Sequence, residues 1–127
     1  MRNFLFPVLL AALLTLAGRT AAQSVTNKSW KTYIENPVND SVILHMYGDS
    51  STVTSLQGDV FLRVRCHVQH DTLRIEDQAD DARGCPASVG LYKIKTEENS
   101  FSLTLIDDSC EGRVAALTNR KWMEIRK

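Results

Sequence analysis

Histidines, paired carboxylates and cysteines are the side chains in this sequence from which a reactive site could be built. The histidines are His45, His67 and His70. Catalysis needs a nucleophile, a base and an orienting group within reach of one another. His67 and His70 flank the end of an expected strand and point to opposite faces under simple alternation. Their spacing, together with Asp71, is compatible with a metal site but is not specific for one.

Two acidic pairs, Asp80-Asp81 and Asp107-Asp108, fall where loops or strand ends are expected. Such carboxylates can bind Ca²⁺, but neither pair belongs to a set with EF-hand spacing, so we expect solvated loop carboxylates. The sequence also has no Gly-rich phosphate-binding loop and no Gly-x-Ser-x-Gly nucleophile motif. We therefore predict that the protein is not an enzyme and uses no metal or cofactor.

The amino terminus has the pattern of a secretory signal. One Arg precedes an apolar run from Phe4 to Ala17, and small residues follow up to Ala22. This predicts a signal peptide over residues 1–22, cleaved before Gln23, because the run is too short for a membrane span. The remaining domain, residues 23–127, is then secreted or periplasmic, with no membrane span and a slight excess of acidic residues. That charge gives no case for nucleic acid, which needs clustered Lys and Arg.

The cysteines at positions 66, 85 and 110 allow three different single bridges in an oxidising compartment. Val89–Thr96 and Phe101–Asp108 alternate as two strands of a hairpin, and folding them together brings Cys85 and Cys110 to its open end. Closing this loop of about 25 residues would stabilise the fold by about 3.5 kcal/mol. Local geometry therefore favours a Cys85–Cys110 disulfide. Cys66 alternates with apolar residues, and we expect it to be a buried core thiol.

The exported part is predicted to be all-β. After the signal, no run of ten or more residues has a helical apolar period. Arg113–Leu117 fits either a strand or a short helical turn. We expect about eight strands joined mostly by hairpins, which favours a small antiparallel up-and-down β-barrel over an open sandwich. The expected strands are Trp30–Ile34, Ser41–Tyr47, Thr52–Leu56, Val60–Val68, Thr72–Glu76, Val89–Thr96, Phe101–Asp108 and Lys121–Arg126.

The second half of the chain carries a series of short motifs. They are Cys85-Pro86, Gly90-Leu91-Tyr92, Leu103-Thr104-Leu105, Asp108-Ser109-Cys110-Glu111-Gly112-Arg113, Ala116-Leu117 and Trp122. In this order they resemble the carboxy-terminal half of small secreted lipocalin-like (calycin-type) proteins, which are mostly bacterial. Trp30-Lys31 is similar to the first-strand Trp of the wider group. The resemblance implies a small β-barrel with a Cys85–Cys110 bridge, and it implies little about activity.

A barrel of eight strands has an interior that side chains just fill or that holds one small ligand. Our leading prediction is a monomeric carrier of a small apolar ligand, held by apolar burial with Tyr92 or Cys66 as a polar contact. The residues expected to point inward and line this site are Leu44, Met46, Val64, Cys66, Tyr92, Ile94, Phe101 and Leu103.

The alternative is a filled barrel that acts on a protein partner through its outer surface or loops, for example as a protease inhibitor. Val42–Tyr47 is apolar on both faces, so one face must lie outside the barrel. An exposed patch over Ile43–Tyr47 would be typical of a protein–protein surface. An accessible cavity would favour the carrier, and a packed interior beside an exposed patch would favour the interaction protein.

Overall fold

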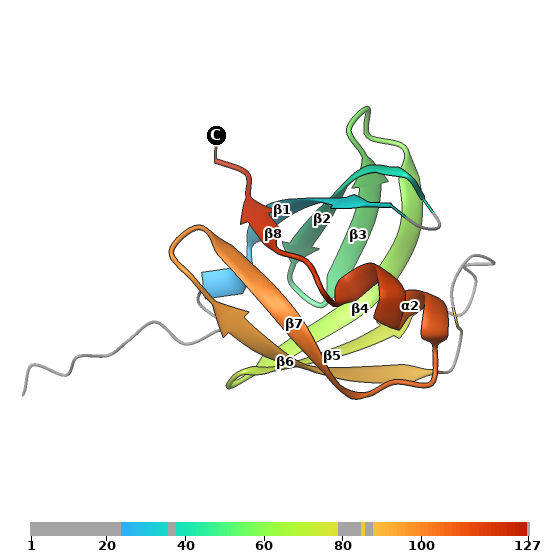
Figure 1. The fold of residues 1–127 in the computed structure, drawn as a ribbon, viewed down its shortest axis with the longest axis vertical. Coiled ribbons are helices and arrows are strands. Elements are labelled where there is room, and N and C mark those ends of the chain that lie inside the picture. The colour runs from blue at the N-terminus through green and yellow to red at the C-terminus, as the bar shows by residue number, and fades with distance from the viewer. Residues whose placement is uncertain (1–23, 36–37, 79–84, 86–87, 127) are drawn as a thin grey trace, which may run out of the picture.

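The structure is a computed structural model that describes residues 24–35, 38–78, 85 and 88–126. The expected signal peptide, residues 1–22, and the acidic pair Asp80-Asp81 lie outside these residues. Eight antiparallel strands form one closed barrel in which each strand pairs with the next along the chain and β8 pairs with β1 (Figure 1). The strands are β1 Lys28–Ile34, β2 Asp40–Tyr47, β3 Ser50–Ser55, β4 Val60–Gln69, β5 Thr72–Asp77, β6 Val89–Thr96, β7 Ser100–Asp107 and β8 Trp122–Glu124. The prediction of an all-β up-and-down barrel is confirmed.

Two-residue alternation places each side chain inside or outside the barrel. On β4, Val64 and Cys66 are buried, whereas Arg63, Arg65 and His67 between and beside them are exposed. The hairpin of β6 and β7 has the expected register, with Ile94 opposite Leu103 and Thr96 opposite Phe101. The two-residue alternation that predicted these strands therefore also predicts which of their side chains form the core.

The segment for which the sequence allowed either a strand or a short helical turn is a helix. Residues Glu111–Leu117 form α2 between β7 and β8, with Leu117 buried and Val114 and Ala116 packed against the core (Figure 1). The closing strand β8 covers only three residues, which is shorter than the expected Lys121–Arg126. Within the described residues, no helix has the length and apolarity needed to cross a membrane.

Barrel closure coincides with a cluster of aromatic side chains. β8 meets β1 and β7 through two residue pairs each, so it contributes few ladder hydrogen bonds. Rings from the three strands compensate: Trp30 and Phe101 pack edge to face with centroids 4.7 Å apart, and Phe101 stacks on Trp122 at 6.2 Å. All three side chains are at most 3% exposed. Their packing closes the sheet where its backbone pairing is shortest.

Both ends of the barrel are covered. Odd-numbered strands share one direction, so the start of β1 and the end of β7 lie at opposite ends. At the first end, Val25 is buried and its carbonyl accepts a hydrogen bond from Trp30 Nε1 at 2.9 Å. At the other end, which we call the mouth, α2 follows β7 and packs Leu117 into the core.

Replacing Phe101 tests the role of the aromatic cluster. We expect Phe101→Ala to lower the free energy of unfolding by about 3–5 kcal/mol, because it leaves a cavity between two indole rings. Met123→Ala, on the exposed side of β8, should change it by less than about 0.5 kcal/mol. Urea unfolding followed by circular dichroism measures both values. Similar losses for the two variants would contradict this account of closure.

Candidate functional site

The eight side chains expected to line a lumen all point inward and belong to one packed core. They retain almost no accessible surface, and a side chain that bordered a water-sized cavity would retain some. The exposed fractions are Leu44 1%, Met46 2%, Val64 0%, Cys66 6%, Tyr92 0%, Ile94 4%, Phe101 1% and Leu103 3%. Their inward placement thus agrees with the sequence, and they fill the space that a ligand would need. Ligand binding by these residues remains a prediction.

The two polar groups expected to contact a ligand are instead surrounded by other groups of the protein. The Tyr92 hydroxyl donates a hydrogen bond to Asp108 at the mouth. Cys66 is a free thiol, and burial away from water raises its pKa to about 11. A thiol with such a pKa is almost entirely protonated near neutral pH and is therefore a poor nucleophile. The expectation of a buried core thiol is confirmed.

A buried ionic cluster lies at the mouth, and sequence reasoning did not predict it. Arg113 of α2 binds Asp108 through two hydrogen bonds, Nε to Oδ2 at 2.7 Å and Nη2 to Oδ1 at 2.8 Å. Its Nη2 also donates to the Ser88 carbonyl at 3.0 Å, and Nη1 lies 3.3 Å from Asp77 Oδ1. The side chains of Arg113, Asp77 and Asp108 are 4%, 2% and 0% exposed. The expectation that Asp108 is a solvated loop carboxylate was wrong, because Arg113 covers it.

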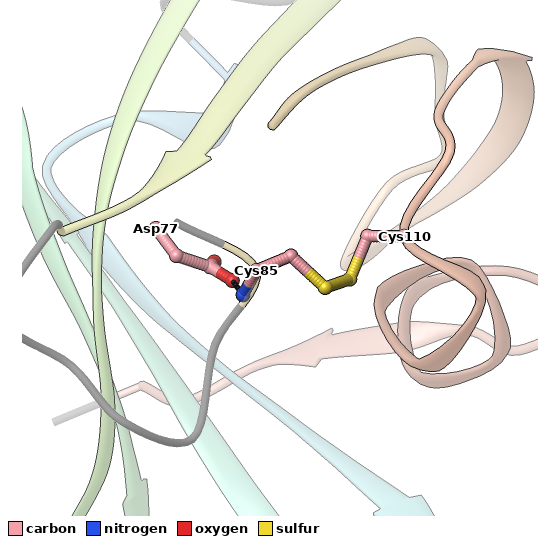
Figure 2. Close-up of side chains that lie close together, drawn as sticks. All are labelled: Asp77, Cys85 and Cys110. Atoms are coloured by element: carbon pink, nitrogen blue, oxygen red, sulfur yellow. Dashed lines mark hydrogen bonds between the residues drawn. A yellow bond between two sulfur atoms is a disulfide. The ribbon is translucent and has the colours of Figure 1, made fainter. Parts of the chain in front are cut away.

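The disulfide adjoins this cluster, and Figure 2 shows the Asp77 side chain beside the bridge between Cys85 and Cys110. Cys85 and Cys110 are joined with a Cα–Cα distance of 6.1 Å, which confirms the favoured pairing. The backbone N–H of Cys85 donates to Asp77 Oδ2, and that of Cys110 donates to Asp108 Oδ1. Each carboxylate therefore contacts both Arg113 and the backbone of one bridged cysteine. A structural disulfide is characteristic of oxidising compartments outside the cytoplasm.

Asp77 and the two bridged sulfurs are the potential metal ligands that converge within the described residues, with their donor atoms within 4.8 Å of one another. A metal would need thiolates, and here both sulfurs are consumed in the disulfide. The carboxylate is likewise taken up by Arg113 and the Cys85 amide. The arrangement therefore serves as a covalent and ionic latch that ties α2 and Cys85 to the barrel. The histidine set whose spacing was compatible with a metal site, His67 with His70 and Asp71, is not brought together in this way.

The ionisation of the cluster follows from its contacts. Burial acts to raise the pKa of Asp108, but hydrogen bonds from Arg113, Tyr92 and the Cys110 amide outweigh it and hold that pKa below its usual value. Burial and the neighbouring Asp108 carboxylate raise the pKa of Tyr92. Burial lowers the pKa of Arg113, yet its carboxylate partners more than compensate and raise it. At neutral pH the cluster therefore contains an ionised Asp108, a charged Arg113 and a neutral Tyr92.

A second site lies on the outer face of the barrel, over β1 and β2. A pocket of about 510 Å³ is lined by Asn27, Lys28, Ser29, Ile43, His45, Tyr47 and Ile125. Ser29 Oγ lies 2.9 Å from His45 Nδ1 and 3.3 Å from the Tyr47 hydroxyl. His45 Nε2 lies 3.0 Å from Thr54 Oγ1. We call this site the outer pocket.

The contacts of His45 in the outer pocket differ from those of a catalytic Ser–His pair. A Ser–His pair needs a third group that stabilises the imidazolium formed when the serine loses its proton. Here the hydroxyl of Thr54 occupies that place instead of a carboxylate. The sequence predicted that Ile43, His45 and Tyr47 share a face. It did not identify Ser29 and Thr54, whose contacts depend on the register of three strands.

The fold and the two sites define a closed eight-stranded antiparallel β-barrel with a disulfide-latched mouth and a polar-rimmed pocket on its outer face. Comparison of the chain with protein-family models, with curated proteins and with solved structures found no match.

Asp108→Asn tests the ionic latch through its pH dependence. The variant should lose about 3–5 kcal/mol of unfolding free energy at neutral pH, because Arg113 stays buried without its full charge partner. A folded-state pKa below the unfolded value of about 3.9 means that the stability is present above that pH and is lost as the pH falls through the folded-state pKa. The difference between wild type and variant should therefore narrow below about pH 4. Unfolding curves at successive pH values measure it, and a constant difference would contradict the assignment.

Cys66 is expected to be unreactive in the folded protein. At about pH 8, iodoacetamide should leave the native thiol unmodified, because burial keeps it protonated and covered. After unfolding in concentrated guanidinium chloride without reductant, one thiol per chain should be alkylated, since Cys85 and Cys110 remain bridged. Mass spectrometry of the intact protein counts the modifications. Rapid modification of the native protein would show that the core around Cys66 opens readily.

Proposed function

We propose that this protein is a secreted or periplasmic, lipocalin-like barrel that acts as an interaction protein, binding a protein partner through its outer surface. The observation that carries the proposal is the filled interior: the eight inward side chains are at most 6% exposed. An apolar ligand would have to separate these side chains, and interiors packed in this way resist such expansion. Binding at the surface needs no such rearrangement. The disulfide supports the extracytoplasmic location.

The outer pocket supplies the chemistry of a protein-binding site. Tyr47 is 49% exposed and stands beside Ile43 and Ile125, which give the pocket an apolar wall. Ser29 adds a hydroxyl group whose position is held by His45, and the His45 ring is itself held by Thr54. Rigid aromatic side chains beside fixed polar groups are typical of energetic centres in interfaces. We therefore assign the partner contact to this pocket, which an apolar side chain of the partner would enter. Inhibition of a protease is one form that such a contact can take.

Site-specific photo-crosslinking in the organism of origin tests this assignment. A photoreactive amino acid at position 47 should give a discrete protein adduct, because Tyr47 borders the pocket. The same probe at position 106 is the matched control, since Ile106 on β7 is 53% exposed and lies outside the pocket. A second substitution, His45→Ala, should reduce the adduct at position 47 severalfold, because the pocket loses the ring that holds the Ser29 hydroxyl in place.

The competing hypothesis is that the protein carries a small apolar ligand. Equal adducts at positions 47 and 106, or none at position 47, would contradict the proposal. Native mass spectrometry of the protein purified from its own source gives the second measurement. A small molecule retained at one per chain would establish the carrier function, whereas the bare mass of the protein agrees with a filled barrel.

A further inference from the structure

Acidic and basic side chains are segregated on this barrel in a way that the balanced composition conceals. The exposed carboxylates of the described residues lie in turns, at strand ends or at the start of α2. They are Glu35, Asp40, Asp49, Asp59, Asp71, Glu97, Glu98, Asp107 and Glu111. Six of the eight exposed Lys and Arg side chains of the described residues lie along strands, and five of these, together with His67, project from the outer face of β4, β5 and β6. These are Arg63, Arg65, His67, Arg74, Lys93 and Lys95, and we call them the cationic face.

Strand register makes the cationic face continuous. His67 stands directly opposite Arg74, and Arg65 stands opposite Glu76 on the same pair of strands. Lys93 is opposite Thr72, one outward position away from Arg74. Within this face Glu76 lies 3.8 Å from Arg74, and Glu97, just beyond the end of β6, is an electrostatic neighbour of Lys95. The face therefore keeps a clear positive excess, although the whole chain has equal numbers of acidic and basic residues.

The spacing of these charges matches an extended polypeptide. Outward residues on one strand recur at about 6.6–6.8 Å, twice the rise per residue. An acidic peptide in an extended conformation presents alternate side chains at the same interval. Because β4 and β5 are paired on both sides in the closed barrel, such a peptide would be held by side-chain charge pairs and not by backbone pairing.

The surroundings of the cationic face favour an acidic peptide over other polyanions as its ligand. The most exposed large apolar side chains of the described residues lie outside the six basic ones, and Leu91, which faces outward opposite Arg74, is half-buried. A lipid surface is usually bound with apolar side chains that insert beside the charges, and single-stranded nucleic acid with exposed aromatic rings between them. Charge complementarity alone, with regular spacing along strands, favours an acidic peptide segment.

We propose that the cationic face docks an extended acidic segment of the partner protein. The proposal rests on the interaction role assigned above and adds the chemistry of the partner. The two surfaces are continuous, because Tyr47 of the outer pocket is opposite Ser50 on β3, and Ser50 is opposite Arg65 on β4. Two strand spacings of about 4.8 Å separate Tyr47 from Arg65, so one partner can reach both.

A synthetic peptide tests the docking directly. The probe is a fluorescein-labelled twelve-residue peptide of alternating Glu and Ser, titrated with the exported, disulfide-bonded protein and followed by fluorescence anisotropy. We expect binding that weakens steeply with added salt, as exposed charge contacts do. The variant Arg65→Gln/Arg74→Gln/Lys93→Gln should lose affinity by about tenfold or more, because three charge contacts are removed.

The matched control is Lys31→Gln/Lys121→Gln/Arg126→Gln, which removes the same charge from exposed positions outside the cationic face. It should change the affinity by less than about twofold. Equal losses in the two variants, or no binding at low salt, would overturn the proposal. Tighter binding to phosphatidylglycerol vesicles or to duplex DNA than to the peptide would also overturn it. The crosslinking at position 47 is a separate readout, so failure of the outer pocket and failure of the cationic face are distinguishable.

Discussion

Closure of the barrel depends on a strand that is too short to close it through backbone pairing alone. β8 contributes two residue pairs to each neighbour, so side-chain packing among Trp30, Phe101 and Trp122 has to hold the joint. These large rings fill the interior on that side of the barrel. The ring packing that closes the sheet is therefore also one reason why the interior of the barrel is filled.

The connection to β8 imposes the second constraint. The chain leaves β7, forms α2 across the mouth and only then returns to the sheet, so α2 must be fixed in place (Figure 1). The disulfide ties Cys110, the residue before α2, to Cys85, and Arg113 ties the first turn of α2 to Asp77 and Asp108. Desolvation of a buried ion pair is costly, but separating its partners would leave an unpaired buried charge, so the pair favours the arrangement that keeps its partners together. Here that arrangement is the closed mouth.

Sequence patterns predicted the parts of this structure that are local. Alternation between residues 60 and 68 identified β4 and its two faces, and the hairpin of β6 and β7 brought Cys85 to Cys110. The burial of Asp108 was not predictable in this way, because it depends on the direction from which Arg113 arrives on a helix. The contact of Ser29 with His45 and Thr54 likewise depends on the register of three strands. Local periodicity therefore predicts which side chains share one face of a strand. Contacts between different strands and α2 depend on the register and packing of the whole fold.

Because the interior is packed, the binding surface that we propose lies on the outside of the barrel. The composition of the whole chain is a poor guide to the charge of that surface. Net charge sums over all faces, whereas recognition depends on the charge that one face presents. In a barrel, alternation gives each strand an outward set, and register places the outward sets of neighbouring strands side by side. Three neighbouring strands with basic outward sets then produce the cationic face, while turns at the barrel ends hold the carboxylates. Because β3 joins this face to the outer pocket, the apolar anchoring and the charge pairing that we propose would share one continuous surface.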